Sequence, residues 1–449
     1  MNLRKQHIFN ALNADNAGSN DLDEAFQNVR IDSRLISKGD IFIAIKGDNV
    51  DGHDFIGDAI NRGASLVLSS KLIKHDSVCV VDDTVKSLGR IAEHLLSKID
   101  KKCIGITGTN GKSTVTRLIA SILKIYKKTH QTYKNYNNQI GLPLSILQAD
   151  DDTEYFVLEL GASKIGDIRE LSSIAKPNIV ALLNVSPAHL ETFGDIENIL
   201  MTKEEIIEDQ GYEKIVVLNK DDKYFDRWNK KASRHRIVTI SKFKDCDYKL
   251  VGQGNGKIII KTPTNDIISV ASEYTEDYML TNILFAAACA LEAGARPSDV
   301  QKGIEGCILP DGRLTVCNGL NGSTILDSTY NANPESFKAA IDSLLKFYGE
   351  KWIIMGEMGE LGDKSFHHHF DVVNYAKARG IQKIFMIGKD GEEIKKTFEN
   401  IIYLFNNMED LIKYIKPMLK SDINILVKAS RFMKFEIIVD AITEKKTSD

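Results

Sequence analysis

Two kinds of hydrophobic pattern alternate along most of this chain. Short apolar runs at residues 103–107, 155–160, 178–185 and 214–219 are typical of strands buried in a parallel sheet. Between the first two runs, residues 113–126 place apolar side chains every three or four positions, which predicts an amphipathic helix that packs on the sheet. This alternation of strands and helices predicts an α/β fold with a parallel central sheet.

Changes in the pattern predict three domains. The first hundred residues contain short strand-like pieces at 39–47 and 64–70 around a helical segment, which fits a small mixed α/β domain over residues 1–99. Pro310 and Gly312 indicate a linker, after which the alternation of strands and helices restarts. We therefore expect a central P-loop ATPase-like domain over residues 100–311 and a Rossmann-like domain over residues 312–449.

Composition narrows the class of protein. The 449 residues include 43% hydrophobic and 27% charged residues, which is ordinary for a soluble globular protein. The net charge of -4 gives no general attraction to nucleic acid or to an anionic membrane. Six scattered cysteines without a C-x-x-C pair indicate reduced, structural thiols. The longest nearly apolar run, 283–291, is about half the roughly 20 residues that span a bilayer, so we expect a cytoplasmic protein.

The segment TGTNGKST, residues 107–114, lies between the first strand and the first helix of the central domain. The N-terminus of that helix presents free N–H groups and a positive dipole end, which suit a phosphate. Gly108 and Gly111 permit close backbone approach, Lys112 neutralises phosphate charge, and the Ser113 hydroxyl is suited to Mg²⁺. The strict phosphate-loop pattern has glycine where this chain has Ile106. A glycine-rich turn with a surface lysine is the alternative, but the order of strand, loop and helix favours a nucleotide.

This loop resembles that of the Mur ligase family, ATP-dependent enzymes that add amino acids or a dipeptide to peptidoglycan precursors. Further segments resemble the family in the expected order, at residues 31–64, 135–147, 159–171, 184–194, 201–206, 327–337, 356–362 and 426–431. Segments 327–337 and 356–362 resemble the members that add D-alanyl-D-alanine. The resemblance thus implies ligation of D-alanyl-D-alanine to UDP-N-acetylmuramoyl-tripeptide through an acyl phosphate, with ATP and Mg²⁺ as cofactors.

The resemblance also implies catalytic and metal-binding residues. Glu159 and His189 each follow a predicted strand, and by resemblance they serve two Mg²⁺ ions together with Ser113. Lys203 is implied to be carbamylated by CO₂, which makes it an anionic metal ligand. The alternatives are polar groups satisfied at strand ends and a solvated surface lysine. The implied catalytic residues are Lys112, Glu159, His189, Lys203 and Arg313.

ATP contacts are implied in two parts of the chain. The residues implied to contact ATP are Thr107, Gly108, Thr109, Asn110, Gly111, Lys112, Ser113, Thr114, Asn282, Arg313, Asp327, Tyr330 and Asn333. Asn282 is expected one turn ahead of a buried helix, where it reaches the adenine. Arg313 is expected to reach the phosphates when the C-terminal domain closes over ATP, although a linker arginine is usually solvated. Asn333 is equally suited to cap the following helix.

Acceptor and dipeptide contacts are implied by the same resemblance. Ser33 and Arg34 match the uridine-diphosphate contact, and Asn137 and Asn138 precede a segment that faces the muramoyl sugar or the diphosphate. Lys428, Ser430 and Arg431 close a predicted strand and offer two cations and a hydroxyl at the edge where open α/β sheets bind ligands. Together with Asn331, they are expected to bind substrate. The run FHHHF, 366–370, predicts a polar helix start rather than a metal site, because three consecutive histidines cannot all face one ion.

Two other readings of the sequence remain open. One is a related ligase, such as the diamino-acid-adding Mur enzyme or a folylpolyglutamate synthase-like enzyme. The other is a nucleotide-gated binding protein without turnover. In each case we expect a monomer whose ligands are small molecules rather than nucleic acid.

Overall fold

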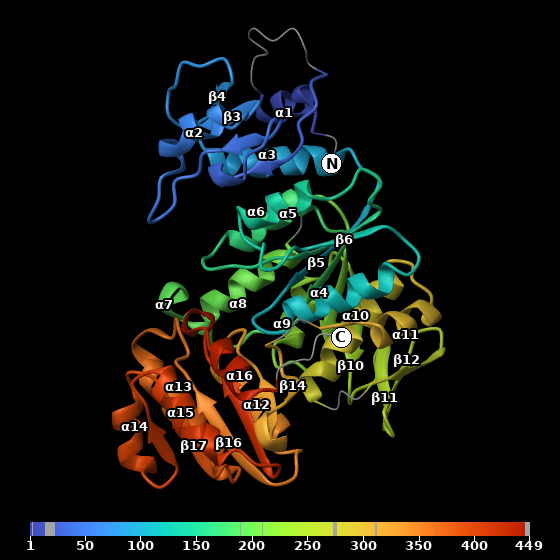
Figure 1. Ribbon diagram of the computed structural model, residues 1–449. Helices are drawn as coiled ribbons and strands as arrows, with labels where there is room; N and C mark the ends of the chain where they lie inside the picture. Colours follow the sequence, from blue (N-terminus) through green and yellow to red (C-terminus); the bar gives the residue numbers. More distant parts are fainter. Residues whose placement is uncertain are drawn as a thin grey trace. The chain divides into compact units, whose positions relative to one another are not determined.

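The computed structural model describes residues 1, 3–13, 23–188, 190–208, 210–272, 276–309 and 312–444. In this part of the chain the strands form three sheets, of four, nine and six strands (Figure 1). The chain divides into two compact units. Unit 1 comprises Met1–Asn184, Met201–Thr275 and Met279–Cys307, and unit 2 comprises Val185–Leu200, Glu276–Tyr278 and Ile308–Asp449. The predicted α/β class with three sheets is confirmed, whereas the exact domain limits stay a prediction.

The N-terminal part of unit 1 is a parallel sheet. Its strands, in spatial and sequence order, are β1 (Val29–Arg30), β2 (Ile41–Ile43), β3 (Leu66–Ser69) and β4 (Val78–Val80). The accompanying helices are α1 (Lys5–Leu12), α2 (Ile56–Asn61) and α3 (Thr84–Ser97). Asp83 begins α3 because its carboxylate accepts the N–H groups of Val85 and Lys86. Apolar side chains from β2, β3 and α2 form the small core beneath.

The large sheet of unit 1 carries the phosphate loop at its centre. Its spatial order is β13-β12-β11-β10-β9-β8-β5-β7-β6. The bounds are β5 (Lys102–Thr107), β6 (Thr129–Gln131), β7 (Tyr155–Glu159), β8 (Ile179–Leu182), β9 (Ile215–Asn219), β10 (Arg236–Ser241), β11 (Tyr248–Gly254), β12 (Lys257–Lys261) and β13 (Ile267–Ala271). Strands β5 to β11 pair in parallel, whereas β12 and β13 are antiparallel to their neighbours. The predicted parallel sheet is confirmed for β5 to β11, and an antiparallel edge of two strands extends it.

The antiparallel edge follows from one turn. β11 and β12 are joined by Asn255 and Gly256, which have φ angles of 51° and 68°. Two consecutive residues with positive φ form the tight hairpin turn for which Asn-Gly is the favoured sequence. The dipeptide was therefore a readable signal for a hairpin that the alternating pattern did not predict.

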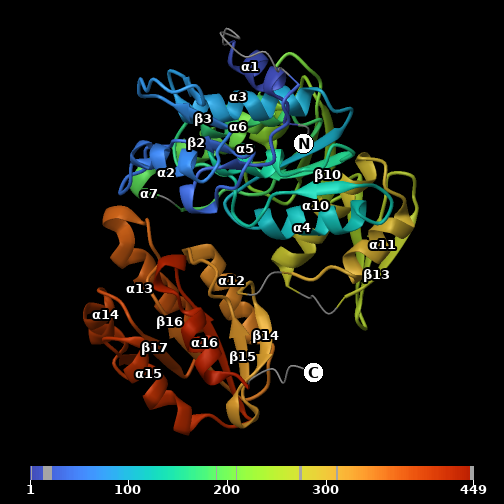
Figure 2. The same cartoon turned by 45° about the horizontal axis from the view of Figure 1, so that its top comes forward.

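Helices cover the central sheet. They are α4 (Lys112–Leu123), α5 (Gly141–Leu147), α6 (Asp167–Ala175), α8 (Ile196–Glu204), α9 (Phe225–Lys231), α10 (Asp277–Glu292) and α11 (Pro297–Glu305). α4 and α11 lie side by side in Figures 1 and 2. The Ser121 hydroxyl donates to the Gly303 carbonyl at 2.7 Å, and a Cβ at Gly303 would lie 2.4 Å from the Ile122 Cα. Glycine is therefore required for this close helix contact.

Unit 2 is built on a six-stranded sheet of order β14-β15-β19-β16-β17-β18. Its strands are β14 (Thr315–Asn318), β15 (Thr324–Asp327), β16 (Glu350–Met355), β17 (Lys383–Met386), β18 (Ile402–Leu404) and β19 (Ile423–Lys428). Only β14 pairs antiparallel among these described strands. The helices are α7 (Leu190–Phe193), α12 (Pro334–Leu344), α13 (Ser365–Ala378), α14 (Gly391–Phe398), α15 (Met408–Ile415) and α16 (Glu436–Ile442).

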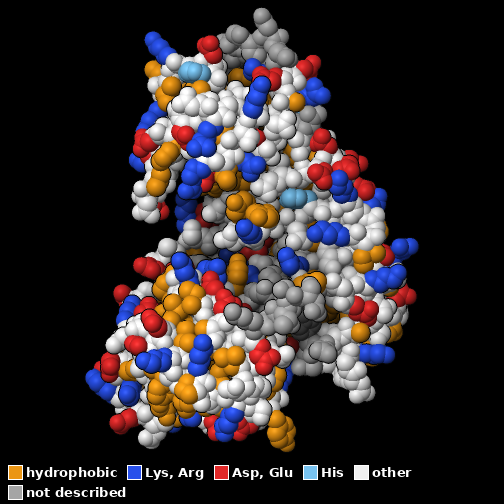
Figure 3. Space-filling view, in the orientation of Figure 1, with side chains coloured by type: hydrophobic (Ala, Val, Ile, Leu, Met, Phe, Trp, Pro, Cys, Tyr) orange, Lys and Arg blue, Asp and Glu red, His pale blue; other side chains and the backbone are white. Residues whose placement is uncertain are grey.

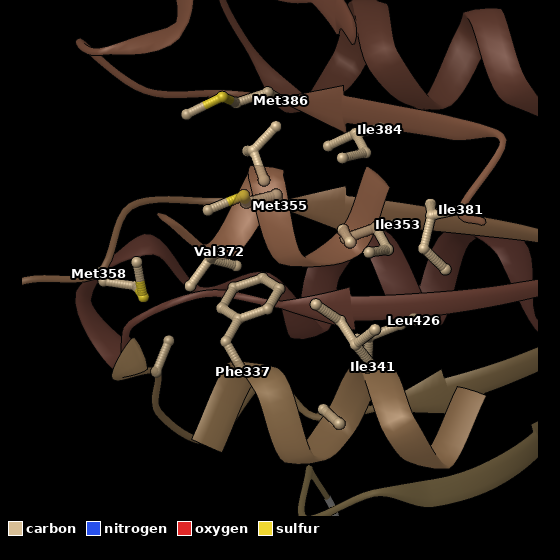
Figure 4. Packing of buried hydrophobic residues seen from close by; sticks show 14 of the residues in the cluster. Phe337, Ile341, Ile353, Met355, Met358, Val372, Ile381, Ile384, Met386 and Leu426 are labelled. Carbon is tan, nitrogen blue, oxygen red and sulfur yellow. The ribbon is translucent and has the colours of Figure 1, made fainter. Parts of the chain in front are cut away.

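Both faces of this sheet are buried. On one face, Phe337 and Ile341 of α12 point toward Ile353, Met355 and Leu426 of the strands (Figure 4). The alternate strand residues belong to a second apolar cluster on the opposite face, with α15 and α16. A sheet covered on both faces explains why its strands are nearly continuous apolar runs.

Three observations at this level bear on the sequence expectations. All six cysteines are free. No helix among the described residues is long and apolar enough to cross a membrane. The histidines of 366–370 lie in α13, as the helix prediction requires. Figure 3 shows acidic and basic side chains interspersed over the visible face of each unit, in keeping with the small net charge.

Candidate active site

Three adjacent strands of unit 1 bring the predicted groups to one edge. β8, β5 and β7 are neighbours, with Ile106 opposite Glu159 and Thr107 opposite Leu182. Because the three strands are parallel, their carboxyl ends lie at the same edge, where open α/β sheets bind ligands. The phosphate loop, Glu159 and the residues after β8 therefore meet there.

The two glycines of the loop have no room for a side chain. Gly108 and Gly111 have φ angles of 154° and 89°. A Cβ at Gly108 would lie 2.9 Å from the Leu183 Cβ, and one at Gly111 would lie 2.6 Å from the Asn282 Oδ1. Asn282 lies inside α10 rather than one turn ahead of a helix, and it is buried against the loop.

Asn184, which the sequence analysis did not single out, holds the loop in place. Its Oδ1 accepts the Asn110 N–H at 2.9 Å, and its Nδ2 donates to the Asn110 carbonyl at 3.0 Å. Its own carbonyl accepts the Thr109 N–H at 2.9 Å. The available signal was its place directly after a buried strand, in the same segment as His189.

The cation of the loop lies over its backbone. Lys112 Nζ donates to the carbonyls of Gly108 at 2.8 Å and Thr109 at 3.1 Å. Thr107 is buried and donates its hydroxyl to the Leu160 carbonyl at 2.8 Å. Thr114 is also buried, in the first turn of α4. The helix N-terminus, two glycines and one ammonium group thus form an anion-binding loop.

Glu159 links the loop to the segment before α5. Its Oε2 accepts the Ser113 hydroxyl at 2.6 Å, and its Oε1 accepts the Asn137 amide at 2.7 Å. The carboxylate is 3% exposed, so both bonds form in a largely desolvated place. Three residues predicted from separate motifs are therefore in direct contact.

Lys203 lies in the same group of charges. Its side chain is 4% exposed, at the end of α8. Burial, followed by the nearby Lys112 ammonium, lowers the pKa of Lys203 to about 7, while Glu159, Asp167 and Glu205 act in the opposite direction. The reading as a solvated surface lysine is wrong, because the residue is buried among the groups of the loop.

The other predicted residues of unit 1 make local contacts. The Asn138 Oδ1 accepts the Gly141 N–H at 2.8 Å at the start of α5. Ser33 is buried, and its hydroxyl contributes to the lowered pKa of Asp58 after the stronger effect of Arg62. Arg34 is exposed and pairs with Asp32 through two bonds, of 2.9 and 2.7 Å. His189 lies outside the described residues.

A second group of predicted residues lies at the strand ends of unit 2. Asp327 pairs with Val427 across β15 and β19, and Met355 pairs with Lys428 across β16 and β19. Lys428 Nζ donates to the Asn331 carbonyl at 2.8 Å and to the Ser328 hydroxyl at 2.9 Å. Burial, followed by the nearby Arg313, lowers the pKa of Lys428 to about 7.

An aromatic and cationic pair lies on the same edge. The Arg313 guanidinium stacks 3.9 Å from the centre of the Tyr330 ring, and its buried Nε has no hydrogen-bond partner among the described residues. The Asp327 Oδ1 accepts the Thr329 N–H and hydroxyl at 3.0 and 2.7 Å. The Asn331 Oδ1 accepts the Ala332 N–H.

Three remaining residues of unit 2 have clear local partners. The Asn333 Oδ1 accepts the Ser336 N–H at 2.9 Å, so it caps α12. The Ser430 hydroxyl accepts the Gly359 N–H at 2.8 Å and connects the loops after β19 and β16. Arg431 is exposed and pairs with Glu436 at 3.1 Å.

His369, to which the sequence assigned no role, supports the loop after β16. Its Nε2 accepts the Met358 N–H at 2.9 Å, and its Nδ1–H donates to the Ser365 carbonyl at 2.8 Å. Burial lowers the pKa of this imidazole, so the neutral form is favoured. Among the described residues, no group of three or more His, Cys, Asp or Glu side chains is placed to hold a metal ion.

Family models match three segments that together make up most of the chain. The Mur ligase family catalytic domain matches residues 25–91, the Mur ligase middle domain matches residues 106–290, and the Mur ligase glutamate ligase domain matches residues 312–431. The matched segments contain most of the predicted contact residues, from Ser33 to Arg431.

Relatives and solved structures agree with these matches. The UDP-N-acetylmuramoyl-tripeptide--D-alanyl-D-alanine ligase of Buchnera aphidicola (strain APS) is 34% identical over 93% of this chain and 93% of its own length. The enzyme of the same name from Bacillus subtilis is 30% identical over 94% of each chain. A crystal structure of MurF from Acinetobacter baumannii superposes with a TM-score of 0.89, at 26% identity and 98% coverage of both chains. The structure of MurF ligase from Thermotoga maritima in complex with ADP has a TM-score of 0.82, at 30% identity, over 92% of this chain and 96% of that one. The chain belongs to the Mur ligase family.

Proposed function

We propose that this protein uses ATP to join D-alanyl-D-alanine to UDP-N-acetylmuramoyl-tripeptide in the synthesis of peptidoglycan precursors. Relatives that cover over nine-tenths of the chain carry this activity in their names. The single structural observation that supports it most is the contact of Glu159 with the Ser113 hydroxyl beside the phosphate loop. A carboxylate, a hydroxyl and the Lys112 ammonium are the groups that phosphoryl transfer requires.

The chain's own residues position and neutralise the phosphates. The N–H groups at the start of α4 face an anion, and the Lys112 ammonium neutralises charge on the transferred phosphoryl group. Transfer of that group from ATP to the acceptor carboxylate gives ADP and an acyl phosphate. The dipeptide amine then attacks the acyl carbon, loses a proton and releases inorganic phosphate as the amide forms. Asn184 and Asn282 support the loop so that these groups do not have to move before transfer.

The residues beside the loop fit a divalent cation. Hydroxyl and carboxylate oxygens are the ligands that Mg²⁺ prefers, and those of Ser113 and Glu159 lie 2.6 Å apart. Ser113 and Glu159 would hold Mg²⁺, which would neutralise charge on the phosphates. We include His189 among its ligands on resemblance alone.

We further propose that Lys203 is carbamylated. Only a neutral amine adds CO₂, and burial near Lys112 favours the neutral form of Lys203. The resulting carbamate would supply an anionic oxygen close to Glu159. The nucleotide contacts proposed in unit 2 are Arg313, Asp327, Tyr330 and Asn333, and those proposed for the dipeptide are Asn331, Lys428, Ser430 and Arg431. A cytoplasmic monomer remains part of the proposal.

A matrix of phosphate-release assays tests the function. ATP is combined with each UDP-muramoyl peptide and each candidate amine, including free amino acids and a folate acceptor. We expect phosphate only when UDP-N-acetylmuramoyl-tripeptide and D-alanyl-D-alanine are both present. Oxygen-18 in the acceptor carboxylate should appear in that phosphate, and its absence from phosphate while product forms would contradict the acyl phosphate.

Two lysines of the α4 region provide a matched pair for this assay. Lys112→Met should abolish phosphate release, because the loop loses its only ammonium group seen among the described residues 107–114. Lys124→Met, at an exposed position just after α4, should retain the activity. Equal activity of the two variants would exclude phosphoryl transfer at this loop.

A further inference from the structure

The helix that carries Lys203 ends in an unusually buried polar segment. α8 runs to Glu204 and continues as a short 3₁₀ turn over Glu205–Ile207. The four consecutive residues Thr202, Lys203, Glu204 and Glu205 are each at most 4% exposed. Buried polar groups require partners, so the surroundings of this segment must be specifically arranged.

The two acids that follow Lys203 are bound by two neighbouring helices. Glu204 pairs with Arg227 of α9 at 2.6 Å. The two carboxylate oxygens of Glu205 accept the N–H groups of Gly166 and Arg169 at 2.7 and 2.9 Å, at the start of α6. These contacts fix the sides of the helix but leave the carbonyls of its last turn without helical N–H partners.

A buried lysine binds those carbonyls. Lys214 Nζ donates to the carbonyls of Ile206 at 3.2 Å and Glu208 at 3.0 Å. The side chain is 1% exposed, and it directly precedes β9. The carbonyl between them, of Ile207, accepts the His235 Nε2–H at 2.8 Å, from the residue directly before β10. Lys214 and His235 directly precede the adjacent strands β9 and β10. Together they bind three successive carbonyls at the end of the Lys203 helix.

Burying the charged Lys214 side chain at the end of the helix costs desolvation free energy. Burying a charged amine requires hydrogen bonds that replace its hydration. Among the described residues, the acceptors of Lys214 include the carbonyls of Ile206 and Glu208 and, at 3.4 Å, the Gln210 Oε1. A cation at a helix C-terminus stabilises those carbonyls and the helix dipole. Lys214 and His235 lie at the amino ends of β9 and β10, the edge of the sheet opposite the phosphate loop. Their bonds therefore anchor the C-terminal end of the helix, and with it the position of Lys203 three residues before Ile206.

We propose that Lys214 is a positioning residue for Lys203. By bonding the terminal carbonyls of the helix to the sheet, it holds the Lys203 amine beside Lys112 and Glu159, where the carbamate is needed. This inference deepens the proposed function and rests on its assignment of Lys203. The competing explanation is that Lys214 only stabilises the fold. In that case its loss would act independently of Lys203.

A double-mutant cycle in the full-length protein separates the two explanations. The variants are Lys203→Ala, Lys214→Met and their combination, assayed for phosphate release with saturating substrates. We expect Lys214→Met alone to lower kcat about tenfold or more with little change in KM for ATP, and to cause no further loss beyond about twofold in the Lys203→Ala background. Equal fold losses in both backgrounds would overturn the inference.

The carbamate provides a readout that does not depend on turnover. With ¹³C-labelled bicarbonate, the NMR signal of a lysine carbamate should be present in the unmodified protein, absent in Lys203→Ala and several-fold weaker in Lys214→Met. Equal signals in the unmodified protein and Lys214→Met would also overturn the inference. If Lys203→Ala keeps full activity and the signal, the proposed role of Lys203 itself is wrong.

Two further variants control for folding. Lys214→Gln removes the charge but keeps an amide donor, so it should show the same pattern in milder form if Lys214→Met does not fold. Lys102→Met removes a comparable bond, since Lys102 Nζ donates to the Ala293 carbonyl at the end of α10 at 2.9 Å. It should leave both kcat and the carbamate signal unchanged, and a loss like that of Lys214→Met would show that the effect is not specific.

Discussion

Gly111 and Gly380 have similar positive φ angles, of 89° and 82°. They differ in surroundings: a Cβ at Gly111 would lie 2.6 Å from the Asn282 Oδ1, whereas one at Gly380 would meet nothing within 4 Å. If alanine at position 111 weakens nucleotide binding and alanine at position 380 does not, the loss therefore comes from contacts of the phosphate loop and not from backbone strain alone.

Gly111→Ala should weaken ATP binding by about tenfold or more, equivalent to roughly 1.4 kcal/mol, because Asn282 and the loop must separate. Gly380→Ala carries a similar strain of about 1–2 kcal/mol and should leave the affinity unchanged. Isothermal titration calorimetry with a non-hydrolysable ATP analogue measures both. An unchanged affinity for Gly111→Ala would mean that the loop does not bind the phosphates in this conformation.

At the scale of a helix, α12 tests the two readings of Asn333. Its Oδ1 caps the helix, so Asn333→Ala should cost about 1 kcal/mol of unfolding free energy. Asn333→Ser keeps a good capping group and should retain that stability in urea unfolding. We expect the serine variant to raise KM for ATP, as a nucleotide contact requires. Unchanged KM and stability would leave only the capping role.

At the scale of a strand, β6 contains a histidine that is uncharged when folded. His130 packs against Phe156, and burial lowers the pKa of its imidazole to about 4 from 6.5. Between these values the unfolded chain binds more protons than the folded protein, so stability falls as the pH falls through this window.

His130→Phe removes this titration. The loss of unfolding free energy between pH 7 and pH 4.5 should therefore be smaller in the variant than in the unmodified protein, by roughly 1–3 kcal/mol. Urea unfolding at the two pH values measures the difference. The same pH dependence in both proteins would show that His130 titrates normally in the folded state.

At the scale of the whole molecule, the chain divides into two compact units, each of which has fully buried apolar side chains. Phe337 is fully buried in unit 2, and Ile119 is fully buried in unit 1. Chains with more than one compact unit commonly unfold in more than one step. Scanning calorimetry should therefore resolve more than one transition.

Substitutions in each core should affect different transitions. Phe337→Ala should destabilise unit 2 by about 3–5 kcal/mol and Ile119→Ala should destabilise unit 1 by about 2–5 kcal/mol. Each variant should lower the temperature of one transition and leave the other in place. A single transition that shifts equally in both variants would mean that the units unfold together.

Segment Val185–Leu200 shows that sequence position does not decide membership of a unit. It follows β8 of the central sheet, yet it belongs to unit 2. The Glu191 N–H donates to the Glu360 carbonyl at 3.3 Å, and α7 contacts the turn Gly362–Lys364. A pattern of apolar residues predicts elements, but it contains no information on which distant element a short polar segment contacts.

The sequence by itself determined the order of strands and helices, the anion-binding loop and the family, because these depend on local periodicity and on residues close together in the chain. It did not predict the hairpin at Asn255, the support of the loop by Asn184, or the burial of Lys203. Those depend on which residues, tens of positions apart, the sheet brings to one edge. Only the tertiary structure removes Lys203 from water, and that burial lowers the pKa of its amine to about 7, so that a substantial fraction is neutral near pH 7.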